Sequence, residues 1–200
     1  MFLFYILYVI MKIIVLVILI LVPISIYWLY SKFIIYTERF QATPETYITE
    51  KRKEYTIIPF KDVKPDAKLQ VINYLNDEWK KDTGITYTEE FVNNTWKFPD
   101  ALYVMTDKDD DFIGCSGIDR YMSYPFISHI YVKKPYRKKG IGAKLFDVVV
   151  QHAKSVGYKT VHGWCKDELV PYYESFNCER CASSTLLKPF LGFNLMKLNL

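Results

Sequence analysis

The sequence predicts a mixed α/β domain that follows an apolar, membrane-spanning N-terminal helix. Residues 1–36 are almost wholly apolar, whereas the rest of the chain mixes apolar and charged residues. In that remainder, segments with strand character alternate with segments whose apolar residues recur with the helical period. One strand-like segment, 126–132, leads into a basic, glycine-containing turn and then into a helical pattern. Strands before and after helices in one short domain indicate a mixed sheet flanked by helices.

The N-terminal segment is long enough to cross a bilayer. Its uncharged run, residues 13–30, spans about 18 residues, which as a helix covers the hydrocarbon core. A cleaved signal peptide would have a shorter apolar region followed by small residues, and residues 27–30, Tyr-Trp-Leu-Tyr, offer no such cleavage site. We therefore predict an uncleaved, single-pass membrane anchor over residues 1–36. Met11, which is followed by Lys12, could serve as an alternative start.

The flanking charges predict the orientation of this anchor. Only Lys12 precedes the apolar core, whereas five basic residues follow it within a short distance: Lys32, Arg39, Lys51, Arg52 and Lys53. Because Lys and Arg are retained on the cytoplasmic side, the folded domain is expected in the cytosol. The glycosylation sequon at Asn93 would be modified only in the opposite orientation.

After the anchor, residues 37–54 are polar and are expected to form a tether, and residues 55–200 are enough for one domain. The formal net charge of the chain is only +4, which argues against a nucleic-acid-binding surface. The oligomeric state is not indicated by any pattern in the sequence.

The first half of the domain should alternate strands and helices. A strand is expected at 55–59 and a helix at about 65–80, with Leu69, Ile72, Leu75 and Trp79 on one apolar face. A second helix should start after Thr88, a suitable N-cap, and end near residue 95. Strands are then expected at 101–106 and 112–121, joined by an acidic turn.

The second half continues with a strand at 126–132 and a helix that begins near Gly140 and stops at Gly157. A strand at 159–165, a helix at about 167–176 and a closing strand at about 193–198 complete the expected elements.

The basic turn before the predicted helix at Gly140 has the composition of a phosphate site. Gly140 and Gly142 lack side chains, so backbone N–H groups at the helix start can close on an anion, which the helix dipole favours. Four basic side chains add charged donors: Arg137, Lys138, Lys139 and Lys144. A nucleic-acid patch or a merely solvated basic face are the alternatives, and the position at a helix start favours a phosphate ligand.

With its strand and helix, the segment 135–142, Pro-Tyr-Arg-Lys-Lys-Gly-Ile-Gly, resembles the pyrophosphate loop of the GNAT superfamily of acyl-CoA-dependent N-acetyltransferases. A second segment, 165–176, is similar to the strand and helix that end in the family's Phe-Tyr-Glu-Lys-Leu-Gly-Phe signature, and its Leu-Val-Pro-Tyr-Tyr form is similar to arylalkylamine N-acetyltransferases. The resemblance covers roughly residue 55 to the C-terminus. It implies a GNAT-type fold, in which two central strands splay apart around the pantetheine arm.

The resemblance also implies a co-substrate, acetyl-CoA, and an amine acceptor, which is a small amine or a polypeptide amine. The alternative is a non-catalytic, acyl-CoA-binding sensor or scaffold tethered to the membrane. Ten residues match the family's donor-binding positions: Ile130, Val132, Arg137, Lys138, Lys139, Gly140, Ile141, Gly142, Ala143 and Lys144.

Acetyl transfer needs a proton donor for the departing thiolate and a base for the amine. Tyr173 aligns with the family's tyrosine general acid, and a phenol with a pKa of about 10 holds its proton at neutral pH; Tyr172 is the alternative. Ser128 matches the position of a histidine in some arylalkylamine acetyltransferases, and His129 is next to it. Strand alternation points His129 away from the site unless a bulge reverses its face.

The sequence departs from the family pattern at two places. Lys166 stands where many family members have Asn, and Phe176-Asn177-Cys178 replaces the usual Leu-Gly-Phe. Five aromatic residues in the acceptor region suit an arylalkylamine or a peptide, and they suit an ordinary core equally: Trp79, Tyr87, Phe91, Trp96 and Phe98.

Four residues have a spacing that invites a zinc site: His162, Cys165, Cys178 and Cys181. His162 and Cys165 are three apart on a predicted strand, so their side chains should point to opposite faces. We therefore predict no metal.

Overall fold

The computed structural model describes residues 48–52, 54–121, 124–181 and 192–200. All of them belong to one compact unit, residues 43–200. The predicted anchor, residues 1–36, and most of the predicted tether lie outside the described residues. Within the described ranges, no helix combines the length and the apolarity needed to cross a membrane.

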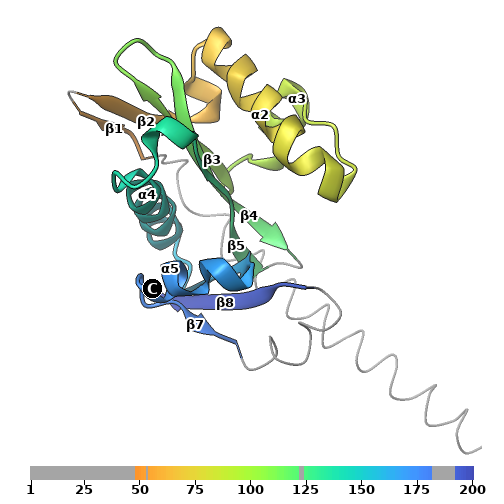
Figure 1. Ribbon diagram of the computed structural model, residues 1–200, viewed down its shortest axis with the longest axis vertical. Helices are drawn as coiled ribbons and strands as arrows, with labels where there is room; N and C mark the ends of the chain where they lie inside the picture. Colours follow the sequence, from red (N-terminus) through yellow and green to blue (C-terminus); the bar gives the residue numbers. More distant parts are fainter. Residues whose placement is uncertain (1–47, 53, 122–123, 182–191) are drawn as a thin grey trace, which may run out of the picture. The chain divides into compact units, whose positions relative to one another are not determined.

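The described residues contain a single eight-stranded sheet with the strand order β1-β2-β3-β4-β5-β6-β8-β7 (Figure 1). β5 and β6 run parallel, and every other neighbouring pair is antiparallel, so the predicted mixed sheet is confirmed. The strands are β1 (Glu50–Lys51), β2 (Tyr55–Pro59), β3 (Ala101–Asp107), β4 (Phe112–Tyr121), β5 (Tyr124–Val132), β6 (Thr160–Cys165), β7 (Glu179–Arg180) and β8 (Asn194–Asn199).

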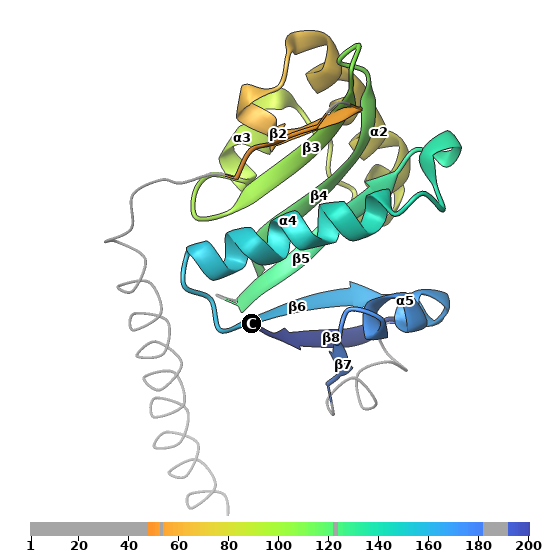
Figure 2. The ribbon, with the colours of Figure 1, turned by 90° about the vertical axis from the view of Figure 1, so that its left-hand side faces the viewer.

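Helices cover both faces of this sheet. α2 (Pro65–Thr83) and α3 (Glu89–Thr95) lie on one face, and α4 (Ile141–Ser155) lies across β3, β4 and β5 on the other (Figures 1 and 2). α5 (Val170–Glu174) follows β6 and lies on the α4 side, where Tyr173 packs on Phe146. The two faces are named below after α2 and α4.

The apolar face of α2 differs from the predicted one at one position. Val71 and Leu75 are fully buried and Trp79 packs against the same core, but Leu69 is 59% exposed, so its assignment to this face was wrong. Ala67, rather than Leu69, continues the buried row in steps of four residues. The predicted N-cap of α3 is confirmed, because the Thr88 hydroxyl accepts a hydrogen bond from the N–H of Phe91.

The edges of the sheet contain two strands that the sequence did not predict. β1 pairs with β2, so residues 50–51 of the predicted tether belong to the sheet, and β7 pairs with β8. Strands of two residues carry no measurable periodicity, which explains why the pattern missed them. The predicted helix at 167–176 is shorter, because residues 167–169 form a 3₁₀ turn before α5.

His152 is a core residue. It is fully buried, its Nδ1 lies 2.9 Å from the hydroxyl of Tyr103, and its Nε2 lies 2.8 Å from the carbonyl of Pro99. Burial lowers the pKa of this imidazole, so it is neutral inside the fold. The side chain therefore ties α4 to β3 and to the loop before it.

β5 and β6 splay apart after a single paired position, as the GNAT-type fold requires. Their register contains only Phe126 opposite His162, whereas β4 follows β5 as far as Val132 and β8 follows β6 as far as Cys165. Figure 2 shows the two strands diverging toward the side on which α5 lies. The edge of β5 beyond the paired position therefore faces a gap, where its backbone groups can bind a ligand.

Candidate active site

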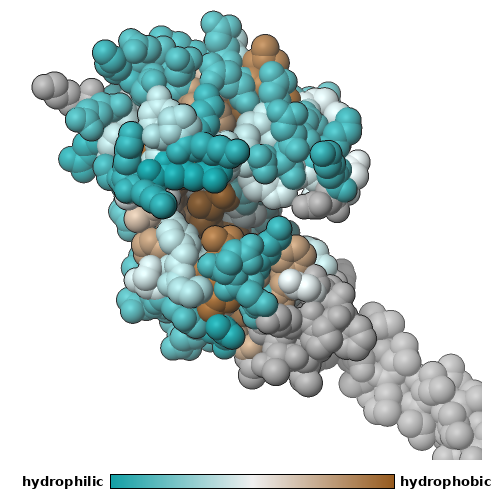
Figure 3. Space-filling view, viewed as in Figure 1, coloured by the Kyte–Doolittle hydropathy of each residue, from teal (hydrophilic) through white to brown (hydrophobic). Residues whose placement is uncertain are grey.

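A cavity of about 570 Å³ lies where the end of β5, the start of α4 and α5 meet. Figure 3 shows apolar side chains in the hollow over β5 beside α5, with hydrophilic side chains around it. Eight of the ten predicted donor-binding residues line this cavity, and so does the predicted acid. The lining residues are Ile130, Tyr131, Val132, Arg137, Lys138, Gly140, Ile141, Gly142, Ala143, Leu169, Tyr172 and Tyr173.

The loop before α4 is shaped by residues with positive φ. Gly140 is the N-cap of α4 with φ 75°, a conformation that glycine adopts without steric cost, and Lys138 has φ 60°. No side chain caps this helix. Because the first N–H groups of a helix have no acceptor within it, those of α4 are available to an anion in the cavity.

Gly142 is required for a second reason, which is close packing. A methyl group at this position would lie 2.8 Å from the hydroxyl oxygen of Tyr172 and 3.9 Å from a methyl carbon of Val132. The Tyr172 hydroxyl is buried and has no hydrogen-bond partner among the described residues. The absence of a side chain at Gly142 therefore keeps the cavity open between α4 and α5.

The basic residues of the loop divide into two groups. Arg137 lines the cavity, and its Nε donates a 2.8 Å hydrogen bond to the carbonyl of Val132. Lys139 and Lys144, which were expected in the binding set, do not line it. Their ammonium groups lie over aromatic rings instead, Lys139 at 5.6 Å from the ring centre of Tyr136 and Lys144 at 4.3 Å from that of Tyr55.

Tyr173 reaches the cavity from α5. Its side chain is largely buried against Phe146 and Tyr172, at ring-centre distances of 6.1 and 5.5 Å. Burial raises the pKa of the Tyr173 phenol well above its ordinary value, and the neighbouring Cys165 and Tyr172 raise it further. Burial also raises the pKa of Tyr172. Both phenols therefore keep their protons at neutral pH and can act as donors.

A β-bulge reverses the expected direction of His129. Gly117 pairs with Ser128, but Cys115 pairs with Tyr131, so β5 has one extra residue between these positions. His129 has φ 53°, within the left-handed region. The bulge places Ser128, His129 and Tyr131 on the α2 side, and neither Ser128 nor His129 lines the cavity on the α4 side.

His129 is enclosed by aromatic side chains from α2, α3 and their loop. Its Nε2 lies 3.2 Å from the hydroxyl of Tyr87, and its ring lies 4.6 Å from Trp79 and 4.9 Å from Trp96. Burial lowers the pKa of His129 to about 4, so the imidazole is neutral at pH 7 and is a weak base. Its Nδ1 is buried without a partner in the described part of the chain.

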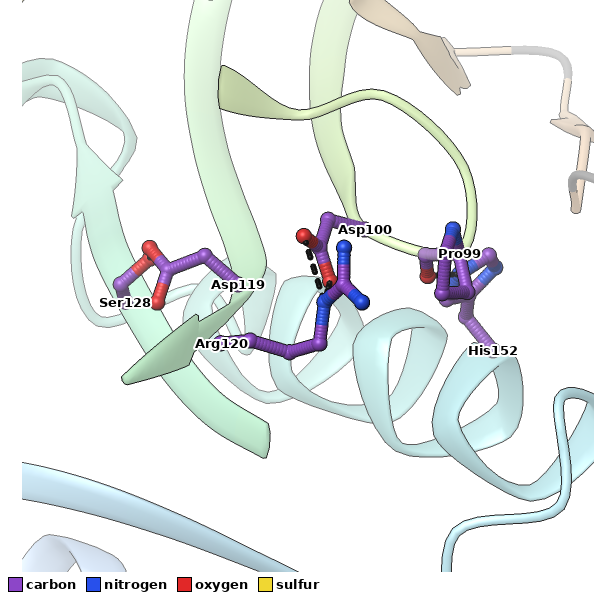
Figure 4. Close-up of polar contacts among 6 residues, drawn as sticks. All are labelled: Pro99, Asp100, Asp119, Arg120, Ser128 and His152. Carbon is purple, nitrogen blue, oxygen red and sulfur yellow. Dashed lines mark hydrogen bonds and ion pairs between the residues drawn. The ribbon is translucent and has the colours of Figure 1, made fainter. Parts of the chain in front are cut away.

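Asp119 is a candidate that the sequence analysis missed. Ser128 donates a 2.6 Å hydrogen bond to its carboxylate, and Figure 4 shows the two side chains pointing toward each other. Burial raises the pKa of Asp119, against the opposite effect of this hydrogen bond. The available signal was a charged residue in a strand whose preceding residues, 112–118, are all uncharged.

The neighbouring residue Arg120 is engaged elsewhere. Its Nε lies 3.0 Å from both carboxylate oxygens of Asp100 (Figure 4). Burial raises the pKa of Asp100 to about 6, although Arg120 acts in the opposite direction. Arg120 therefore balances the charge of Asp100.

The potential zinc ligands do not come together. Over the described ranges, no group of three or more His, Cys, Asp or Glu side chains is placed to hold a metal ion. His162 is half-buried and Cys165 is buried, as expected for opposite faces of one strand.

The structure thus has two chemically distinct regions on either side of β5. The α4 side offers backbone N–H groups, basic side chains and a phenol, and the α2 side offers a carboxylate, a hydroxyl and an imidazole among aromatic rings. β5 lies between these regions, and its edge beyond Phe126 is not paired with β6.

Comparison with known proteins identifies this arrangement. Residues 70–177 match the family described as "Acetyltransferase (GNAT) family", which is more than half of the 200-residue chain. The chain has no match among curated proteins.

Several solved structures share the fold. An acetyltransferase of the GNAT family from Staphylococcus aureus Mu50 is 18% identical, with 72% of this chain and 98% of that chain covered and a TM-score of 0.55. A GNAT family acetyltransferase from Elizabethkingia anophelis with acetyl-CoA bound is 17% identical, with 74% and 100% covered and a TM-score of 0.52.

N-acetylglutamate synthase from Neisseria gonorrhoeae, complexed with coenzyme A and N-acetyl-glutamate, is 13% identical, with 75% of this chain but 36% of that chain covered and a TM-score of 0.54. At such identities the likeness shows the fold, and the family match extends from α2 to the end of the second signature segment. The chain belongs to the GNAT acetyltransferase family and is an acyltransferase.

Proposed function

We propose that this enzyme transfers the acetyl group of acetyl-CoA to a primary amine. The observation that carries the proposal is the cavity that joins the uncapped N-terminus of α4 to the gap between β5 and β6. The helix start suits the pyrophosphate of the donor, and the gap suits its extended pantetheine arm.

The residues on the α4 side fit acetyl-CoA in charge and shape. Arg137 and Lys138 line the cavity beside the start of α4, and Gly142 leaves room that a larger residue would fill. Ile130 and Val132 also line the cavity, and they lie on β5 beyond its last pairing with β6. Their backbone groups can therefore bind the amide groups of the pantetheine arm as a neighbouring strand would.

The reaction needs an acceptor for the amine proton and a proton donor for the departing thiolate. The neutral amine nitrogen attacks the thioester carbonyl carbon, the new C–N bond forms, the C–S bond breaks, and the amine nitrogen loses a proton to a base or to water. The departing thiolate takes the proton of the Tyr173 hydroxyl, which solvent then restores. Because burial raises its pKa, the Tyr173 phenol holds its proton before this step, and the proton moves to the sulfur as negative charge develops there while the C–S bond breaks.

Titration calorimetry of the full-length protein with acetyl-CoA tests this proposal. We expect binding in the micromolar to submillimolar range and release of the CoA thiol when an amine is added. Binding without thiol release across a panel of amines would favour a non-catalytic sensor. Absence of binding by the folded protein would contradict the proposal.

We also propose that residues 1–36 anchor the enzyme in a membrane as a single pass, with the catalytic domain in the cytosol. The apolar run at 13–30 and the basic residues that follow it support this topology. A cytosolic domain would also have access to cytosolic acetyl-CoA.

The sequon at Asn93 provides the test of topology. Asn93 is exposed on α3, so oligosaccharyltransferase could reach it if the domain entered a lumen. Synthesised with microsomes, the full chain should stay unglycosylated and sediment with the membranes after alkaline extraction. As the control, an N-terminal extension with its own sequon should be glycosylated. Modification of Asn93, or extraction of the chain, would contradict the topology.

A further inference from the structure

We propose that the acceptor binds on the α2 side of β5 as a cation, with its ammonium group held by the Asp119 carboxylate. The inference rests on the proposed function and gives it a substrate class, namely primary amines with an apolar or aromatic body and no carboxylate beside the amine. Asp119 is then a specificity-determining residue.

The charge of Asp119 is not matched by any described residue. Among the described residues its hydrogen bond comes from Ser128, and it forms no ion pair. Arg120, the adjacent cation, is held by Asp100. Because a partly buried carboxylate is stabilised by a counter-charge, a bound ammonium group would satisfy Asp119 where the fold does not.

Aromatic rings and unpaired polar atoms lie near Ser128, the residue that hydrogen-bonds this carboxylate. The position of a methyl group at Gly117, on the same face of β4, is 2.7 Å from the indole nitrogen of Trp96 and 2.9 Å from the hydroxyl oxygen of Ser128. That indole nitrogen and Nδ1 of His129 are both buried without a partner in the described residues. Aromatic faces attract organic cations, so this surrounding favours an acceptor that carries a positive charge.

The carboxylate is also close to the place of reaction. Ser128, which contacts Asp119, is two residues beyond the last paired position of β5 and β6, and Ile130 already lines the donor cavity. An amine that loses its proton to water and leaves Asp119 therefore has to pass the edge of β5 between Ser128 and Ile130 to meet a thioester in the gap.

An α-amino acid would be disfavoured by the same geometry. Its carboxylate lies next to its amine, so binding the amine at Asp119 would bring two negative charges together in a partly buried site. Phenylalanine and 2-phenylethylamine differ only in this carboxylate, which makes them a matched pair of probes.

The test compares these two acceptors on the full-length enzyme, with acetyl-CoA affinity measured in the same samples. Wild type should acetylate 2-phenylethylamine with a kcat/KM at least about tenfold above that for phenylalanine. Asp119→Asn should raise the KM for 2-phenylethylamine about 10- to 100-fold, with a smaller change in kcat and an unchanged Kd for acetyl-CoA. Asp119→Glu, which keeps the charge, should recover part of the loss.

Asp147→Asn is the matched control, since it removes the same charge from an exposed carboxylate of α4 whose hydrogen bond among the described residues comes from Gln151. Three results would overturn the inference: equal use of the two acceptors, use of neither, or an Asp119→Asn variant that behaves like Asp147→Asn. In each case, binding of acetyl-CoA by the same samples would still support the proposed function. Loss of acetyl-CoA binding by folded wild type would overturn both.

Discussion

Replacement of Gly142 by Asp should abolish acetyl-CoA binding, with a Kd at least about 100-fold higher than that of wild type. The new carboxylate would stand at the start of α4, where the donor's phosphates are expected, and like charges at close range are strongly unfavourable. Its Cβ would also meet the Tyr172 hydroxyl oxygen at 2.8 Å, so the side chain cannot turn away freely. Titration calorimetry of the full-length variant measures the loss.

Two further variants separate the causes. Gly142→Ala adds only the methyl group and should weaken binding less than Asp does. Gln151→Glu adds one negative charge at an exposed position of the same helix and should leave the Kd near that of wild type. If Gly142→Asp bound acetyl-CoA as wild type does, the cavity would not be the donor site.

Replacement of Tyr173 by Phe should lower kcat about 10²- to 10⁴-fold and leave acetyl-CoA affinity unchanged. The substitution removes one hydroxyl from a ring that remains packed on Phe146, so the shape of the cavity is kept. Without this proton donor, the thiolate must leave unprotonated. Thiol release under saturating acetyl-CoA reports kcat, and calorimetry reports the Kd.

Tyr172→Phe is the matched control for this experiment. It removes the adjacent phenol, whose hydroxyl is directed toward Gly142, and should change kcat much less. The reverse result, with Tyr172 essential and Tyr173 dispensable, would assign the acid to Tyr172. Full activity in both variants would exclude a phenol as the acid.

The sequence predicted those parts of the structure that depend on local patterns. The turn around Gly140 was identifiable because glycine is the residue that adopts positive φ without steric cost at a helix start. Eight of the ten predicted donor-binding residues line the cavity. Lys139 and Lys144 were expected there because they are basic residues close to the loop in sequence. Their long side chains instead reach the rings of Tyr136 and Tyr55.

The acceptor side was less predictable because it depends on register. For His129 the sequence left two directions open, one for a regular strand and one for a strand with a bulge, and the extra residue in β5 that decides between them shows only in the register. Asp119 was missed because its hydrogen-bond partner, Ser128, lies on another strand. The resemblance to arylalkylamine acetyltransferases in particular stays a prediction, since the family match does not reach that level of detail.

The bulge in β5 also divides the strand into two parts, and the face of the sheet that even-numbered residues occupy changes from one part to the other. Before it, even-numbered residues such as Ser128 face α2; after it, even-numbered residues such as Val132 face α4. A regular strand would place the side chains of Ser128, Ile130 and Val132 on one face of the sheet. The α2 side and the donor cavity would then share these residues. Loss of a single residue here would therefore place a residue of the α2 side, Ser128, on the same face of the sheet as the residues that line the donor cavity.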